Sequence, residues 1–432
     1  MPQSRHEANH GAALPVMNVH LRIAGALFAI VAATAFAQDP QLGAPLPPWT
    51  PGTLDIHQIA TGRGNAALFI LPDGTSLLVD AGAAGDGIPQ TEPHPDATRT
   101  PGAWIARYLT RHLPSGANGL DYALITHFHA DHMGQLTPVS PVSKNGEYRI
   151  TGIIEVDEAL PIHMLIDRGW PDYSYPAPSS DETMTNYRRF LNARTHSGMR
   201  VERFQPGSPA QIRLLHEASK YSSFEIRNIV GNGEMWTGTG ALTRHIFPDL
   251  ASIAPSDRPN ENMCSLAFRL QYGRFRYFTG GDLPGTPDPG FPAWHAPEAL
   301  IASVVGPVDV HVVNQHGSMG EESEAFLKAL QSSVFIVPSW APSHPAPDVV
   351  KRIMNSRLPP AKRLVFVTDL RDAARIVIGQ RATQLAGPPG HIVVRVDPGG
   401  EKYRIFVLDN RDERDLVVAM KGPFTAAGPA RL

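Results

Sequence analysis

Thr126-His127-Phe128-His129-Ala130-Asp131-His132 brings three histidines and one aspartate into six consecutive positions. The preceding run, residues 120–125, is short and apolar and follows Gly119, which predicts a buried strand that ends at these side chains. A histidine-rich loop can be a plain polar turn. The chain has only 18 histidines in 432 residues, however, so this cluster favours metal binding.

The spacing within this cluster predicts two ions. His127 and His129 are two positions apart, so in an extended segment their imidazoles point the same way and can bind one ion. Asp131 and His132 follow the turn and are expected to face a second ion close by. Imidazole and carboxylate ligands together suit zinc, manganese or iron, whereas magnesium and calcium prefer oxygen ligands.

Two later side chains extend the ligand set. Asp282 follows the apolar run 277–279 and two glycines, and His316 follows the apolar run 310–313. Each therefore stands just past the end of an expected strand, as the first cluster does.

These motifs resemble the metallo-β-lactamase superfamily. Its HxHxDH signature matches residues 127–132, its Gly-Asp matches Gly281-Asp282 and its late histidine matches His316. A closer resemblance is to one branch of this superfamily, which is related to the hydrolase domain of bacterial competence (DNA-uptake) channel proteins. The segments that carry this resemblance are residues 56–66, 77–82, Asn260-Glu261-Asn262, His316-Gly317-Ser318 and His344-Pro345. The resemblance covers about residues 54–408. It implies an α/β fold, the αββα sandwich, with an insertion after the first metal motif.

The resemblance also implies how the ligands act. Two divalent ions, zinc first with manganese or iron as alternatives, are expected to share Asp282 and a water. The first ion would be held by His127 and His129, and the second by Asp131, His132 and His316. The ions lower the pKa of the water and polarise the scissile group.

Three side chains near this centre receive expected roles. Asp131 is also a candidate for orienting the attacking hydroxide. His344 is a candidate for protonating the leaving group or contacting the substrate, and a plain turn cap before Pro345 is its alternative. Asp80 ends an apolar strand and is expected either to support a ligand or to cap a turn.

The chain departs from the family pattern at three places. Asn65 stands where many relatives of the branch have aspartate, and Gln315 stands where they have a first histidine of a pair. No recognisable motif supplies the third histidine that the superfamily usually places on the first ion. The candidates are His163, His196, His216 and His245.

Length and composition predict one large metallo-hydrolase domain over residues 51–432. A chain with 42% hydrophobic and 18% charged residues is not disordered. The single cysteine, Cys264, excludes a disulfide within the chain and a cysteine-based metal site. Residues 138–245 are rich in proline and aromatics and less regular, which predicts an insertion that forms a lid or substrate wall.

Hydrophobic patterns outside that segment predict the remaining elements. Strands are expected at 56–60, 67–71, 76–79, 266–270, 275–279, 334–337, 364–367, 391–396 and 403–408, and helices at 103–113 and 322–330.

The amino terminus predicts export. Residues 21–37 are largely apolar and finish in Ala35-Phe36-Ala37, which is typical of signal-peptidase cleavage. Residues 1–37 are therefore predicted to be a signal peptide, and residues 38–50 a Pro-rich linker, with a periplasmic or secreted mature protein. An uncleaved anchor and a start at Met17 are the alternatives.

Charge limits the partners. The formal net charge is −3, and residues 1–37 carry two arginines and one glutamate, so the rest of the chain is near −4 (−3 minus +1). The basic residues are scattered along the sequence and do not form the basic stripe that a protein binding long nucleic acid would normally show. A small or nucleic-acid-derived anionic substrate is compatible, because the ions supply positive charge.

Three functions follow as hypotheses. The first is an exported phosphodiester hydrolase, a nuclease or nucleotide phosphodiesterase. The second is a hydrolase of a lactone, β-lactam or ester with the same ligands. The third is a catalytically silent binding domain that keeps only the fold.

Overall fold

The structure, a computed structural model, describes residues 40–428 except 86, 88, 90 and 180. All elements below lie within one unit, Asp39–Leu432. The predicted signal peptide, residues 1–37, lies outside the described residues. None of the described helices combines the length and apolar character needed to cross a membrane.

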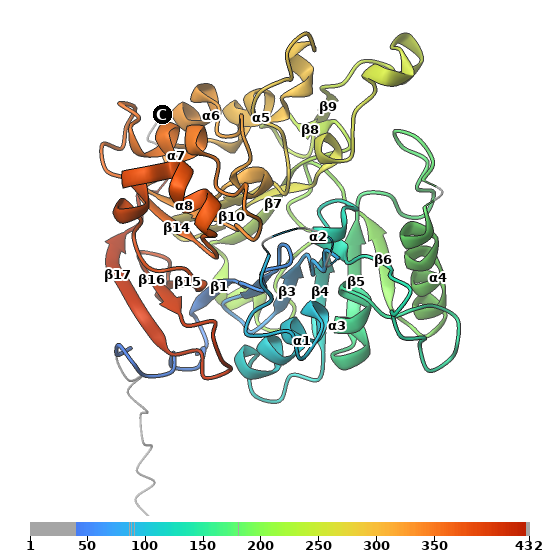
Figure 1. The fold of residues 1–432 in the computed structure, drawn as a ribbon, viewed down its shortest axis with the longest axis horizontal. Helices are drawn as coiled ribbons and strands as arrows, with labels where there is room; N and C mark the ends of the chain where they lie inside the picture. The colour runs from blue at the N-terminus through green and yellow to red at the C-terminus, as the bar shows by residue number, and fades with distance from the viewer. Residues whose placement is uncertain (1–39, 86, 88, 90, 180, 429–432) are drawn as a thin grey trace, which may run out of the picture. The chain divides into compact units, whose positions relative to one another are not determined.

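Two sheets form the centre of the described part (Figure 1). In spatial order the nine-stranded sheet contains β17 (Val417–Thr425), β16 (Lys402–Leu408), β15 (His391–Val396), β1 (Leu54–Gln58), β2 (Ala67–Ile70), β3 (Ser76–Val79), β4 (Leu120–Leu124), β5 (Ile162–Asp167) and β6 (Arg200–Arg203). The eight-stranded sheet contains β14 (Leu364–Val367), β13 (Val334–Val337), β12 (Val310–Val312), β11 (Phe275–Thr279), β10 (Ala267–Tyr272), β7 (Phe224–Gly231), β8 (Glu234–Trp236) and β9 (Thr243–His245).

The facing sides of the two sheets are apolar because side chains alternate along each strand. In β1, Leu54 and Ile56 belong to the core between the sheets, as do Phe69 of β2, Phe268 of β10 and Tyr277 of β11. Phe69 and Tyr277 touch edge to face, with ring centroids 5.5 Å apart. The strands predicted at 391–396 and 403–408 are both present, and they pair as an antiparallel hairpin.

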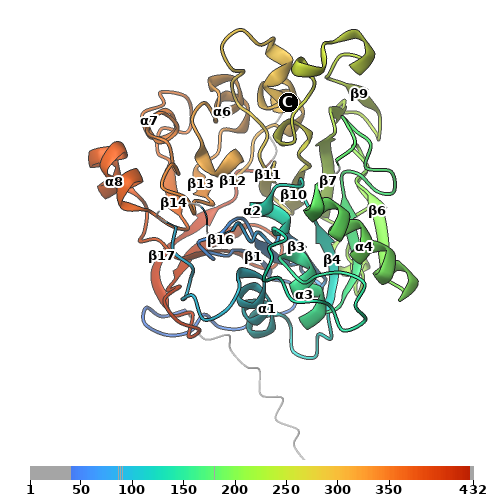
Figure 2. The same cartoon turned by 45° about the vertical axis from the view of Figure 1, so that its right-hand side comes forward.

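Helices cover the outer faces (Figure 2). The nine-stranded sheet packs against α1 (Pro101–His112), α3 (Ile153–Ala159) and α4 (Glu182–His196), and the eight-stranded sheet against α5 (Pro297–Val305), α6 (Glu324–Leu330), α7 (Pro347–Met354) and α8 (Asp372–Ile378). One short helix, α2 (Ala130–Met133), follows β4. The layers are helix, sheet, sheet, helix, so the predicted αββα sandwich is confirmed.

Short 3-10 turns join these elements. They are η1 (Ala218–Tyr221), η2 (Leu250–Ser252), η3 (Pro255–Asp257), η4 (Asn262–Cys264), η5 (Ala293–His295), η6 (Asn314–Gly317) and η7 (Gly379–Gln384).

The segment 138–245 requires a correction. The sequence predicts an irregular insertion there, but the structure places α3, β5, α4, β6, β7, β8 and β9 in it. These strands complete one edge of each sheet. The segment is therefore part of the sandwich, joined by loops that carry its proline and aromatic residues.

Strand direction brings the predicted ligands to one place. β3, β4, β5 and β6 run parallel, as do β11, β12, β13 and β14. Asp80 and His127 follow β3 and β4, and Asp282 and His316 follow β11 and β12. Since ligand sites in such sheets form beyond the carboxyl ends of parallel strands, both sheets deliver side chains to the same edge.

Candidate metal centre

The loop after β4 is fixed by backbone hydrogen bonds to neighbouring loops. The amide of Asn65 donates to the carbonyl of Asp131 at 2.7 Å, and that of Ala81 donates to the carbonyl of His132 at 2.8 Å. A Cβ at Gly82 would lie 2.0 Å from the Asp131 carbonyl oxygen. The close approach of these loops therefore requires glycine at position 82.

Four side chains form what we call the four-ligand site: Asp131, His132, Asp282 and His316. The His132 Nε2 atom lies 3.1 Å from both His316 Nε2 and Asp282 Oδ1. The Asp131 Oδ2 atom lies 3.1 Å from His316 Nε2. These distances allow all four ligand atoms to contact one ion.

Three side chains form what we call the three-ligand site: His127, His129 and Asp282. The His127 Nε2 atom lies 3.1 Å from His129 Nδ1 and 3.7 Å from Asp282 Oδ2. Asp282 thus offers one oxygen to each site. All six predicted ligands come together.

The tautomers of two histidines test whether the four-ligand site fits a cation. The Nδ1 atom of His132 faces the Asp80 carboxylate at 2.7 Å, and that of His316 faces the carbonyl oxygen of Pro338 at 2.9 Å. Both Nδ1 atoms must carry the hydrogen, because both partners are acceptors. In neutral imidazoles the two Nε2 lone pairs then face each other, an arrangement that positive charge between them, from a metal ion or a proton, stabilises.

The charges around the two sites favour the ionised form of the Asp282 carboxylate. Burial raises the pKa of Asp282, but the histidines His132, His316 and His127 outweigh it and hold that pKa well below its usual value. Burial lowers the pKa of His132, but Asp282, Asp80 and Asp131 raise it well above the usual value. The centre therefore concentrates negative charge that a cation would neutralise.

Two unusual backbone conformations aim the later ligands. Gly281 has φ +57°, and a Cβ there would lie 2.9 Å from the Cβ of Thr126. His316 has φ 55° within η6, and its neighbour Gln315 has φ 46°. Positive φ in residues other than glycine is uncommon and tends to mark functional positions.

Residues 60–174 match the family described as the Metallo-beta-lactamase superfamily. This segment of the chain is therefore similar to that superfamily. The matched residues include β4 and the first ligand cluster, and the superfamily typically binds divalent metals. A metal-dependent hydrolase is therefore supported, while the competence-channel branch stays a prediction.

Similarity beyond the family is distant. The crystal structure of human tRNase Z, short form (ELAC1), matches with a TM-score of 0.28 and 12% sequence identity, covering 65% of this chain and 91% of that chain. No curated protein matches the sequence.

Asp80 supports the superfamily motif. Its carboxylate is fully buried and accepts hydrogen bonds from the Thr126 hydroxyl at 2.8 Å and the Asn65 amide at 2.9 Å, besides facing His132. Asn65 in turn accepts a 2.6 Å hydrogen bond from Gln58. The structure places Asp80 behind a ligand, which is the first of its two expected roles.

His344 lies beside the centre. Its ring stacks on His316, with centroids 5.1 Å apart and an interplanar angle of 16°. Its Nε2 atom lies 3.3 Å from the Ser318 hydroxyl. Burial, together with the neighbouring His316, lowers the pKa of His344 to about 3.

The third histidine of the first ion is not found among the four candidates. His163, His196 and His245 are exposed, and His216 lies near Asp121. None of these four belongs to either ligand site. The sequence pattern alone could not decide this, because each candidate stands in an ordinary strand, helix or loop.

An ion pair that sequence reasoning missed braces the ligand loop. Glu261 accepts a 2.7 Å hydrogen bond from the amide of Phe128, between the two histidines, and pairs with the guanidinium of Arg168. That guanidinium also lies 4.5 Å from the Phe128 ring centroid. The Asn260-Glu261-Asn262 segment was the available signal, but nothing marked Arg168, which is 93 residues from Glu261.

An open cavity adjoins Asp131. Its walls include Ala84, Gln135, Leu136 and Trp340, and of the predicted substrate wall, residues 138–245, only Pro138 lines it. The walls beside this ligand thus come mainly from the loops after β3, α2 and β13.

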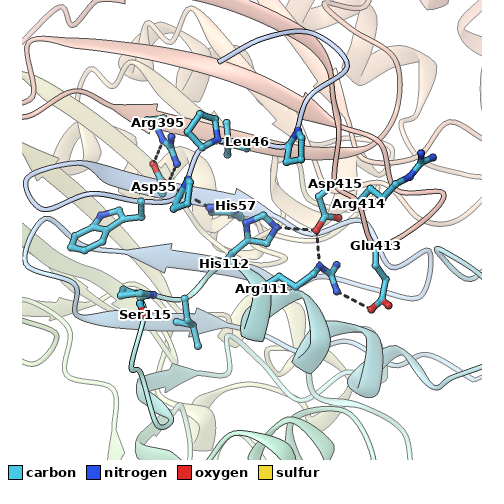
Figure 3. A pocket seen from close by; sticks show the side chains of 16 residues that line it. Leu46, Asp55, His57, Arg111, His112, Ser115, Arg395, Glu413, Arg414 and Asp415 are labelled. Atoms are coloured by element: carbon cyan, nitrogen blue, oxygen red, sulfur yellow. Dashed lines mark hydrogen bonds and ion pairs between the residues drawn. The ribbon is translucent and has the colours of Figure 1, made fainter. Parts of the chain in front are cut away.

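Figure 3 shows a second polar pocket, lined by none of the six ligands. Asp55 and His57 point into it because the alternate residues of β1 face the core. Residues 45–49 form part of its wall, and Pro45 bridges to Leu416. Part of the predicted Pro-rich linker therefore packs on the nine-stranded sheet.

Proposed function

We propose that this chain is a hydrolase that binds two divalent ions, zinc first and manganese or iron as alternatives, and cleaves phosphodiester bonds. The observation that carries the proposal is Asp282, whose Oδ1 atom belongs to the four-ligand site and whose Oδ2 atom belongs to the three-ligand site. A carboxylate shared in this way suits a pair of ions.

Divalent ions held by the two sites would supply a hydroxide nucleophile near neutral pH and would stabilise negative charge on the attacked group. The protein's own part is positioning. Asp80 and the Pro338 carbonyl orient His132 and His316. Asp131 lies at the open cavity, where it can accept a hydrogen bond from the attacking water.

His344 is the residue we assign to the substrate. It stacks on His316, and Ser318 lies within 3.3 Å of its Nε2 atom, so both side chains stand beside the four-ligand site. There they can donate hydrogen bonds to an oxygen of the substrate or leaving group.

The choice of phosphodiester follows from the sequence resemblance to the competence-channel branch and from the pair of sites. A pair of sites suits an in-line displacement at phosphorus, in which negative charge develops on both the attacking and the leaving oxygen. A lactone, β-lactam or ester remains the alternative, because it would use the same ligands.

The test combines metal content with turnover. Purified protein is analysed for metals and assayed with bis(p-nitrophenyl) phosphate, a chromogenic lactam and a chromogenic ester. We expect close to two ions per chain and turnover of the phosphodiester, both lost in Asp282→Asn and retained in Asp288→Asn, a change at an exposed aspartate. Turnover of the lactam or ester alone would favour the alternative, and no metal in a folded protein would favour a binding domain.

Export and the substrate's size belong to the same proposal. We expect the mature protein to begin near residue 38 in the periplasm or medium, which mass analysis of the natively produced protein can test. We expect nucleotides or short oligonucleotides rather than long nucleic acid, because basic residues do not form a stripe.

A further inference from the structure

The two ion sites differ in the protein groups that build them. We infer that the four-ligand site binds its ion tightly, whereas the three-ligand site binds its ion weakly and exchanges it. This inference rests on the proposed function, since it concerns the same centre.

Ligand number is the first difference. The four-ligand site offers two imidazoles and two carboxylates, and the three-ligand site offers two imidazoles and one carboxylate shared with its neighbour. The carboxylate of Asp131 adds negative charge only to the four-ligand site. Asp80, in contact with His132, adds a further charge on the same side.

Support behind the ligands is the second difference. In the four-ligand site, His132 and His316 are buried, with 1% and 3% of their surface exposed, and each has its Nδ1 atom bound to an acceptor. Such outer partners fix the tautomer and ring orientation, and losing one typically weakens metal binding by about 10–100-fold. The ligand nitrogens are thus already directed at the ion.

The three-ligand site has less of this support. His129 is exposed, and within the described part of the chain its ring has one hydrogen-bonding neighbour, the Nε2 atom of its fellow ligand His127. Binding an ion must replace that contact and immobilise the ring. His127 has only a 3.3 Å approach to the Thr126 hydroxyl behind it.

Among residues 40–428, which hold the four candidates, no third imidazole compensates. His163, His196, His216 and His245 all lie outside both sites. With three protein ligands, the ion at this site keeps positions open to water or substrate. Weak binding and open coordination therefore have the same structural cause.

The experiment is a calorimetric titration of the metal-free full chain with Zn²⁺, followed by elemental analysis after gel filtration. We expect two steps of one ion each, with dissociation constants at least about tenfold apart, and close to one ion retained after filtration. His129→Ala should remove only the weaker step, and His316→Ala the tighter one. His163→Ala, an exposed histidine on β5, should leave both steps unchanged.

Two ions binding with equal affinity would overturn the inference, as would loss of the tighter step in His129→Ala. If His316→Ala does not fold, Asp80→Asn replaces it and should weaken the tighter step alone. No binding to a folded wild-type chain would overturn both this inference and the proposed function. Two unequal steps without phosphodiester turnover would support the inference and count against the proposed substrate.

Discussion

The Asp80 Oδ2 atom lies 2.7 Å from the Nδ1 atom of His132, and both side chains are almost fully buried. This contact holds the imidazole with Nε2 toward the four-ligand site. We predict that Asp80→Asn lowers the Zn²⁺ affinity of that site by roughly 10–100-fold, measured by competition with a chromophoric chelator. Asp288→Asn, at an exposed position, is the control and should bind as the wild type does. Equal affinities in the two variants would contradict the prediction.

Asn65 explains one departure from the family pattern. Its amide donates to Asp80 while its oxygen accepts from Gln58, so both ends are used. We predict that Asn65→Asp, which sets a second carboxylate against Asp80, lowers the free energy of unfolding by roughly 1–3 kcal/mol at pH 7. Urea unfolding measures this.

The matched control for Asn65→Asp is Asn145→Asp. The Asn145 oxygen accepts hydrogen bonds in an exposed loop, and aspartate can accept them equally well. An equal loss of stability in the two variants would show that the contact with Asp80 is unimportant.

The sequence predicted the parts of this fold that depend on neighbours along the chain. The ligand motif and the strands β4, β11 and β12 follow from apolar runs that end in glycine or polar residues. Strand β6 was not predicted, because its sequence, Arg200-Val201-Glu202-Arg203, is mostly charged and shows no apolar alternation. Its pairing with β5 is a tertiary contact, which local pattern does not encode.

The candidate site was predictable to the same extent. Side chains that can hold an ion are marked by their chemical type, so the six residues of the two sites could be named. Arg168, which braces the loop through Glu261, follows an ordinary strand and has no such mark. The unequal support behind His132 and His129 likewise depends on contacts with Asp80 that only the folded chain makes.

The Arg168–Glu261 pair is predicted to stabilise the ligand loop. Arg168 is 5% exposed, so neutralising its partner leaves a poorly solvated charge. We predict that Glu261→Gln lowers the free energy of unfolding by roughly 1–3 kcal/mol and weakens binding at the three-ligand site. Glu217→Gln, which breaks an exposed pair with Lys220, should change stability little. Similar losses in both variants would argue against the brace.

Gly281 is predicted to be essential for placing Asp282. In Gly281→Ala the new Cβ would meet Thr126 at 2.9 Å, in addition to the strain of φ +57°. Gly290→Ala is the control, because Gly290 has φ +92° with open space around it. We expect Gly290→Ala to lose roughly 1–2 kcal/mol of stability and keep its metal, and Gly281→Ala to lose metal as well. Full metal content in Gly281→Ala would refute the prediction.

The buried imidazole of His57 is expected to make the free energy of unfolding depend on pH. It lines the pocket of Figure 3 with 1% of its surface exposed, and Tyr108 lies 2.9 Å from its Nδ1 atom. Burial, only partly offset by Asp55, lowers the pKa of His57 to about 4, from an ordinary value of 6.5. Between these values the unfolded chain binds a proton that the folded chain does not. Stability should therefore fall as the pH drops from 6.5 to 4, and this contribution should level off below 4.

Urea unfolding of the metal-free protein at pH 7 and pH 4.5 tests this prediction. We expect His57→Gln, whose amide can still meet the Tyr108 hydroxyl, to lose less stability over this interval than the wild type, by roughly 2–3 kcal/mol. His391 has its pKa lowered to about 3 by burial and retains a similar dependence in both proteins, so the variant's curve should flatten without becoming level. His163→Gln, at an exposed histidine, should follow the wild type. A His57→Gln curve parallel to the wild type would mean that His57 is protonated in the folded chain.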